Sequence, residues 1–264
     1  MSTRTYPVTL PDVGTVDVST ADFGSGQTFV VLHGGAGPQS VLPFAERFAD
    51  EHGVRVIAPT HPGFGGTERP EALSGIGTLA HLYDQLIADL DLEDVTVIGN
   101  SVGGWITAEI ALRQSPRVSG IVLVDAVGLE VADHPVADFF GMTMDEVFER
   151  TFHDPAPFRF DPTTLPPAAA AIAAGNRAAL AAYAGTAMTD PGLAARLSTL
   201  ETPTLVLWGE SDRIVDPTYG RAYADAIPLA RFELLPKTGH APQQETPDVV
   251  IEAIWNAGEP TTTA

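Results

Sequence analysis

The stretch DVTVIGNSVGGWITA, residues 94–108, decides the fold. It begins with the β-branched residues of a buried strand, passes through a serine set between glycines, and continues with the residues of a helix. On a tight turn from strand to helix, a serine projects its hydroxyl from the carboxyl edge of the sheet. Gly99 and Gly103 remove the Cβ atoms that would collide in that turn. The stretch therefore predicts an α/β protein with Ser101 at the edge of its sheet.

The same alternation of strand and helix continues on both sides of this stretch. Near-continuous apolar runs, which a sheet covered on both faces requires, occupy residues 27–34, 54–59, 94–100, 118–126, 202–210 and 230–236. Helix-like segments at 40–51, 78–91, 102–114, 217–226 and 245–257 alternate with them. Residues 6–20 are typical of an antiparallel hairpin. We therefore predict a mostly parallel, eight-stranded α/β sheet flanked by helices.

One segment, residues 130–199, departs from this alternation. It has no clear strand, several proline-bearing joints, and alanine-rich helical stretches at 166–187 and 191–199. Its aromatic residues argue against a disordered linker, so we expect a helical lid inserted after the sixth strand. The expected organisation is a first core part at 1–129, the lid at 130–199, a second core part at 200–257 and a tail at 258–264.

The composition narrows the class of protein. The 264 residues carry a formal charge of −20, are 44% hydrophobic and include no cysteine. The acidity disfavours nucleic-acid and membrane partners, and the lack of cysteine excludes disulfides, thiolate metal sites and a cysteine nucleophile. No apolar run approaches the roughly 20 residues of a membrane-spanning helix, and the N-terminus lacks a signal-peptide core. We expect a cytoplasmic protein that acts on a small molecule, and the sequence leaves its oligomeric state open.

A second glycine turn, HGGAGP at residues 33–38, follows the first parallel strand. Such a turn frees backbone amides to face the serine, so the Gly35 N–H is a candidate oxyanion donor. The second candidate is the Val102 N–H, at the N-terminus of the helix that follows Ser101. The alternative for the glycine turn is a plain strand end. His33 is expected to orient this loop.

Two further polar residues follow later strands. Asp212 comes after the strand at 202–210, and His240 comes after the strand at 230–236. A serine hydroxyl is a poor nucleophile until an imidazole takes its proton, and a carboxylate must fix the tautomer of that imidazole. The chain order Ser101, Asp212, His240, each after a strand, is the order that the glycine-flanked serine turn demands.

Six motifs together resemble the α/β-hydrolase superfamily: VVLHGGAG, PTHPGFGGTERP, VTVIGNSVGGWITAEIA, IVLVDAVG, PTLVLWGESDRIV and TGHAPQQETPDVV. The similarity is greatest to its single-domain, lid-bearing branch of esterases and carbon–carbon bond hydrolases, and it covers about 25–130 and 200–257. The resemblance implies Ser101 as nucleophile, His240 as base and Asp212 as acid, with Gly35 and Val102 as the oxyanion hole. It implies neither a metal nor a cofactor. Serine at position 101 argues against the epoxide hydrolase and haloalkane dehalogenase branches, whose nucleophile is an aspartate.

The resemblance leaves the identity of the acid open, because some members take it from the preceding strand end, where Asp125 stands. We favour Asp212, since GESDRIV matches the commoner pattern, and expect a structural hydrogen bond for Asp125. Asp216, before Pro217, is a candidate helix cap.

The predicted substrate pocket is lined by apolar side chains. Its candidate apolar residues are Trp105, Phe139, Phe140, Met142 and Met188. We expect a serine hydrolase that acts on a small, largely apolar ester or lactone. A carbon–carbon bond hydrolase of ring-fission products is the alternative, although Ala241 stands where a tryptophan is typical of that group. A non-hydrolytic ligand-binding protein with the same fold is the alternative from another class.

Overall fold

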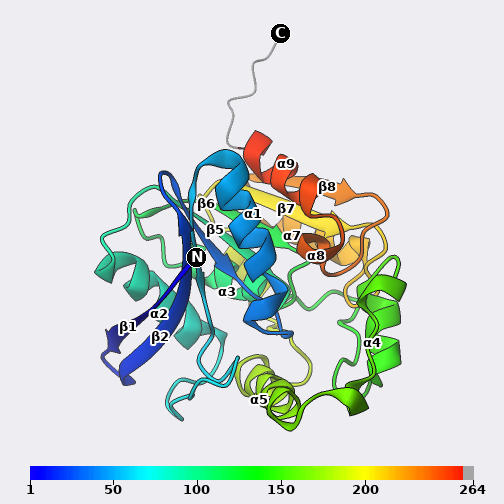
Figure 1. Cartoon of the computed structure of the whole chain (residues 1–264). Helices are drawn as coiled ribbons and strands as arrows, with labels where there is room; N and C mark the ends of the chain where they lie inside the picture. Colours follow the sequence, from blue (N-terminus) through cyan, green and yellow to red (C-terminus); the bar gives the residue numbers. More distant parts are fainter. Residues whose placement is uncertain (258–264) are drawn as a thin grey trace.

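The computed structural model describes residues 1–257, and the predicted tail at 258–264 lies outside this range (Figure 1). The strands are β1 (Ser2–Leu10), β2 (Gly14–Gly24), β3 (Thr28–Leu32), β4 (Arg55–Pro59), β5 (Val95–Asn100), β6 (Val118–Val124), β7 (Thr204–Gly209) and β8 (Ala230–Leu235). The α-helices are α1 (Leu42–His52), α2 (Ile76–Asp89), α3 (Val102–Ala111), α4 (Met144–Thr151), α5 (Pro167–Ala184), α6 (Leu193–Leu197), α7 (Pro217–Ala226), α8 (Pro242–Glu245) and α9 (Pro247–Ala257).

The strands form one eight-stranded sheet in the order β1-β2-β4-β3-β5-β6-β7-β8. β1 and β2 form an antiparallel hairpin, β2 is also antiparallel to β4, and every other neighbouring pair is parallel. The prediction of a mostly parallel eight-stranded sheet is confirmed. Because parallel strands end at a common edge, the loops after β3, β5, β6, β7 and β8 meet there.

Helices cover both faces of the sheet (Figure 1). On one face, α1 and α9 bury Phe48 and Ile251 in a core cluster with residues of the sheet, and α2, α3 and α7 form the core of the other face. Nine of the ten residues of α3 are buried, so this helix is held on all sides. The turn before α3, which carries Ser101, is therefore fixed by the core.

The connection from β6 to β7, residues 125–203, is termed the β6–β7 segment and contains α4, α5 and α6. The helical stretches predicted at 166–187 and 191–199 correspond to α5 and α6, whereas α4 was not among the predicted helices. Its signal is a capping box: the Thr143 side chain accepts from the Glu146 N–H, and the Glu146 carboxylate accepts from the Thr143 N–H.

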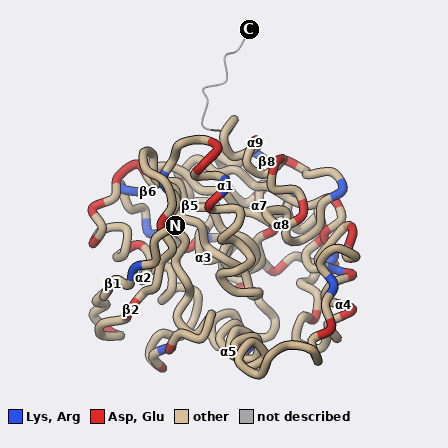
Figure 2. The backbone as a smooth tube through the Cα atoms, viewed as in Figure 1, with Lys and Arg blue, Asp and Glu red and all other residues tan. Residues whose placement is uncertain are grey.

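The surface charge is dispersed. Figure 2 shows acidic residues at many separate places along the backbone, and near α4 they are mixed with basic ones. Several arginines are already paired with carboxylates, among them Arg55 with Asp22 and Arg113 with Asp84. Within residues 1–257, every helix is too short or too polar to cross a bilayer.

Candidate active site

Ser101 occupies the sharp turn between β5 and α3 in a strained backbone conformation, with φ 56° and ψ −119°. The turn is possible only with glycine beside it. A Cβ at Gly99 would lie 2.1 Å from the Gly103 carbonyl oxygen, and one at Gly103 would lie 2.4 Å from the Leu32 carbonyl oxygen. The serine remains partly exposed, so its hydroxyl is accessible at the carboxyl edge of the sheet.

Ser101, His240 and Asp212 form one hydrogen-bonded chain. The Nε2 atom of His240 lies 3.0 Å from the Ser101 hydroxyl oxygen, and its Nδ1 atom lies 2.7 Å from Oδ2 of Asp212. Because a carboxylate accepts, Nδ1 carries the proton and Nε2 is free to accept one from the serine. The structure thus brings together the three residues predicted from strand ends after β5, β7 and β8.

The Asp212 carboxylate is fixed by its own loop. Its Oδ1 atom accepts from the backbone N–H groups of Ile214, at 2.7 Å, and Val215, at 3.1 Å. Burial raises the pKa of Asp212, while these backbone hydrogen bonds act to lower it. Four residues further on, Asp216 caps α7 by accepting from two backbone N–H groups, as predicted.

The His240 loop is held from two sides. The His240 N–H donates to the Thr151 carbonyl at the end of α4, and the His240 carbonyl accepts from the Asn100 side chain at 3.0 Å. Burial lowers the pKa of His240 to about 4. The imidazole is therefore neutral at neutral pH, which is the state that can accept a proton. Sequence reasoning assigned no role to Asn100, and this hydrogen bond supplies one.

The glycine turn after β3 lies directly against the nucleophile. A Cβ at Gly34 would come within 3.1 Å of the Ser101 Cβ atom. No hydrogen bond among residues 1–257 uses the Gly35 N–H. The Val102 N–H, as the first of α3, has no partner within its own helix. Both predicted oxyanion donors are therefore free to bind another group.

Two buried histidines behind this turn hold its shape. The Nδ1–H of His33 donates to the Gly34 carbonyl at 2.7 Å, and its Nε2 accepts from the His61 N–H at 3.1 Å. His61 donates from Nε2 to the His33 carbonyl at 2.8 Å and accepts at Nδ1 from the Tyr83 hydroxyl at 2.6 Å. Each ring thus uses one nitrogen as donor and the other as acceptor, so each is neutral. His33 orients the loop, as the sequence predicted, and His61 holds His33 in place through these hydrogen bonds.

Because His33 and His61 are buried as neutral imidazoles, we expect acid to destabilise the protein. Burial lowers the pKa of His61 to about 4 and that of His33 well below its usual value. Below pH 6.5 the unfolded chain therefore binds protons that the folded chain excludes. The contribution of this pair to the free energy of unfolding is therefore complete above pH 6.5. It decreases as the pH drops from 6.5 toward about 4. Urea unfolding at intervals of half a pH unit measures the slope.

The variant His61→Gln removes one of the two groups that take up a proton when the chain unfolds. Glutamine can still donate to the His33 carbonyl, so the loop keeps this hydrogen bond. We expect the slope of unfolding free energy between pH 6.5 and 4 to decrease by about 1.4 kcal/mol per pH unit, the contribution of one proton. His153→Gln is the matched control, because His153 is exposed, and it should keep the wild-type slope. A wild-type stability that stays constant from pH 7 to 5 would contradict this account.

Helix α5 is hydrogen-bonded to the glycine turn through Asn176, a residue that the sequence did not single out. The buried Asn176 side chain donates to the Ala36 carbonyl at 3.2 Å and accepts from the Gly65 N–H at 2.8 Å. One turn further along α5, Leu180 lies close enough to Gly35 that a Cβ there would clash with it at 2.8 Å. The β6–β7 segment thus contacts both the glycine turn, through α5, and the His240 loop, through α4.

The predicted pocket residues lie in different settings. Trp105 and Met188 are buried in the same core cluster, and the Trp105 ring packs against Gly128. Phe139 and Phe140 are partly buried at the margin of that cluster and contact each other edge to face. Met142 is also partly exposed. Within residues 1–257, the Trp105 Nε1–H is buried without a hydrogen-bond partner.

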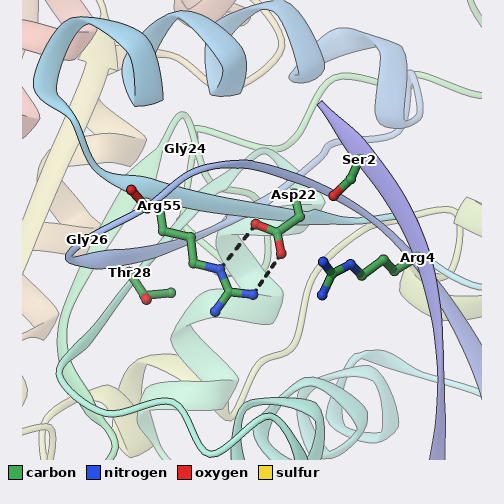
Figure 3. Close-up of a pocket in the computed structure, with 8 residues that line it drawn as sticks. Ser2, Arg4, Asp22, Gly24, Gly26, Thr28 and Arg55 are labelled. Atoms are coloured by element: carbon green, nitrogen blue, oxygen red, sulfur yellow. Dashed lines mark hydrogen bonds and ion pairs between the residues drawn. The ribbon is translucent and has the colours of Figure 1, made fainter.

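A separate hollow opens at the opposite end of the strands (Figure 3). It is lined by Arg4, Asp22 and Arg55, and by glycines and hydroxyl residues around them. Arg55 donates twice to Asp22, at 2.7 and 3.1 Å, so this pair largely neutralises itself. Because Arg55 begins β4, the hollow lies at the amino ends of the parallel strands and belongs to a different edge from Ser101.

A mostly parallel sheet, with a strained serine after β5 and an aspartate and a histidine after β7 and β8, defines an α/β hydrolase. The chain belongs to the alpha/beta hydrolase family, whose model matches residues 29–253. The chain is 36% identical over 126 residues to 2-hydroxy-6-oxo-2,4-heptadienoate hydrolase of Pseudomonas putida, a match that covers 44% of this chain and only 43% of that protein.

Other relatives are matched over more of their length. The chain is 26% identical over 270 residues to 2-hydroxy-6-oxo-6-(2'-aminophenyl)hexa-2,4-dienoic acid hydrolase of Metapseudomonas resinovorans, covering 94% of this chain and 89% of that protein. Among solved structures, a thermophilic esterase from Thermogutta terrifontis has a TM-score of 0.77 at 24% identity and covers 97% of both chains. This structural likeness concerns the fold, while the family and the relatives establish a hydrolase.

Proposed function

We propose that this protein is a serine hydrolase that cleaves a small, largely apolar carboxylic ester or lactone through an acyl-enzyme. The single observation that carries the proposal is the hydrogen-bonded chain of Ser101, His240 and Asp212, with 3.0 and 2.7 Å between successive side chains. A serine that only binds a ligand needs neither an imidazole at its hydroxyl nor a carboxylate behind the imidazole.

The chemistry follows from this arrangement. The Ser101 oxygen attacks the substrate carbonyl carbon while His240 takes the serine proton at Nε2, which gives a tetrahedral oxyanion and an imidazolium. The imidazolium donates its proton to the leaving alkoxide, the carbon–oxygen bond breaks, and the acyl group remains on Ser101. Water then repeats the sequence, with His240 again as base and then as acid, and releases the carboxylic acid. Asp212 stays ionised throughout and stabilises the imidazolium.

The oxyanion is stabilised by backbone donors. In this proposal the N–H groups of Gly35 and Val102 bind it, since both are free of other partners and Gly35 lies in the turn packed against Ser101. The positions of both are fixed before substrate arrives, Val102 by the buried helix α3 and the glycine turn by His33 and Asn176.

The surroundings favour an uncharged substrate. Leu180 packs over Gly35, and Trp105 and Met188 lie in the apolar core cluster that also contains Leu180. We propose that residues 130–199 of this segment act as a lid, with Phe139, Phe140 and Met142 at the margin of the pocket. We further propose that the enzyme works in the cytoplasm on a small molecule and uses no cofactor.

Hydrolysis of a carbon–carbon bond is the second candidate. Two relatives are named for dienoate or dienoic acid substrates, which carry a carboxylate. A pocket for such a substrate needs a cation. Arg177 on α5, next to Asn176, lies over the Phe139 and Phe140 rings and donates to the carbonyl oxygens of both residues. Within residues 1–257 it has no carboxylate partner, so it could pair with one from a substrate.

A substrate panel with one variant separates the two candidates. We expect p-nitrophenyl butyrate and a simple δ-lactone to be hydrolysed with a higher kcat/KM than 2-hydroxy-6-oxo-2,4-heptadienoate. Arg177→Gln should then leave ester hydrolysis within about threefold of wild type, because no carboxylate is bound. A preference for the dienoate, lost by about 10- to 100-fold in Arg177→Gln, would establish the second candidate instead.

A further inference from the structure

A second carboxylate lies directly behind the first. Asp125 follows the last residue of β6 and takes a left-handed backbone conformation, with φ 45°. Its N–H donates to the Leu207 carbonyl of the neighbouring strand β7, and its side chain is completely buried. Because β6 and β7 are adjacent, this residue is placed beside the loop that carries Asp212.

The contacts of the Asp125 carboxyl group are incomplete. Its Oδ1 atom accepts from the Gly209 N–H at 2.9 Å, whereas its Oδ2 atom is buried and receives no donor from any residue in 1–257. One oxygen of Asp125, one oxygen of Asp212 and a ring nitrogen of His240 all lie within 4.8 Å of one another. Both ring nitrogens of His240 are already used by Asp212 and Ser101. The Asp125 and Asp212 side chains therefore form a buried pair of carboxyl groups beside His240.

Two buried carboxyl groups this close cannot both be ionised, so the pair holds a proton. Asp212 accepts three N–H hydrogen bonds, two from its own loop and one from His240, and these stabilise its anion. Asp125 accepts only one. The proton is therefore more stable on Asp125 than on Asp212.

The electrostatic surroundings agree with this assignment. Burial raises the pKa of Asp125 well above its ordinary value, and the nearby charge of Asp212 raises it further. The titratable groups that face Asp125 are Asp212 and His240, from the loops after β7 and β8. Helix α3, which packs on β6, carries one charged residue, Glu109, and that residue is paired with Arg196. A cation that would ionise Asp125 is thus missing from these elements.

We propose that Asp125 is a protonated positioning residue that donates a hydrogen bond from its carboxyl group to the Asp212 carboxylate and so holds that carboxylate against Nδ1 of His240. The proposal rests on the proposed function and adds a fourth member behind its three catalytic side chains. No proton leaves Asp125 during the reaction: its hydrogen bond steadies the Asp212 anion while the imidazolium forms and decays.

The proton itself is directly measurable. We expect the infrared spectrum of the wild-type protein in D2O at pH 7 to contain the C=O stretching band of a protonated carboxylic acid. Asp125→Asn should remove this band. Asp84→Asn should retain it, because Asp84 lies outside the carboxyl pair and contacts Arg113 instead. A wild-type spectrum without the band, or a band that persists in Asp125→Asn, overturns the proposal.

The hydrogen bond is tested by the rate at which a fluorophosphonate modifies Ser101, a reaction that needs the catalytic side chains but no particular substrate. Asparagine can accept from Gly209 and donate to Asp212, and it tolerates the left-handed conformation. Asp125→Asn should therefore react within about threefold of wild type, whereas Asp125→Leu, which makes neither hydrogen bond, should react about 10- to 100-fold more slowly.

Equal rates for the asparagine and leucine variants, whether both fast or both slow, overturn the positioning role. Thermal unfolding shows whether Asp125→Leu is folded. If it is not folded, the infrared band and the Asp125→Asn rate test the proposal without it. A wild-type protein that does not react with the fluorophosphonate contradicts the proposed function. The infrared comparison would then still decide the protonation of Asp125.

Discussion

Asp212→Asn should lower kcat by about 10⁴-fold and leave KM nearly unchanged. The Asp212 carboxylate accepts the Nδ1–H of His240 at 2.7 Å, which keeps Nε2 free for the serine proton. An asparagine can instead turn its amide N–H toward Nδ1 and so stabilise the other tautomer. Nε2 would then carry a proton toward Ser101, and the imidazole could not act as a base. The measurement is steady-state hydrolysis of a p-nitrophenyl ester.

Two variants with the same chemical change control this experiment. Asp216→Asn lies in the same loop and changes the cap of α7 and the contact of Asp216 with His134, so kcat should remain near that of wild type and the thermal midpoint should stay within a few degrees. Asp125→Asn should also keep most of the activity. The reverse pattern, in which Asp125→Asn is inactive and Asp212→Asn is active, would show that Asp125 is the catalytic acid and contradict the geometry.

Much of this architecture could be predicted because the signals are local. The strand predicted at 94–100 is observed at Val95–Asn100, since a run of β-branched apolar residues suits a sheet that is buried on both faces. The turn at Ser101 was predictable from its glycines, whose missing side chains leave room for backbone carbonyls. Helix α4 was also within reach, because the capping box of Thr143 and Glu146 stands in the sequence.

Other features depend on which distant segments meet. The sequence offered Asp125 and Asp212 as alternatives for one role, and it contained no sign that both lie in one buried cluster. That juxtaposition follows from the adjacency of β6 and β7 in the sheet order. Likewise, Asn176 lies in an alanine-rich helix, and its contact with Ala36 joins residues 140 positions apart. Local composition carries no information about such contacts.

Covalent labelling of Ser101 tests the central claim most directly. The Ser101 oxygen should attack the phosphorus of a fluorophosphonate and displace fluoride, so that the intact mass of the protein increases by one phosphonyl group and peptide mapping places that group on Ser101. The reaction requires the neutral His240 imidazole that the structure places 3.0 Å away. Ser101→Ala should stay unmodified, and its ester hydrolysis should fall by about 10⁶-fold. Wild-type protein that is folded but remains unmodified, or is modified at another residue, would contradict the account and favour a ligand-binding protein with a hydrolase fold.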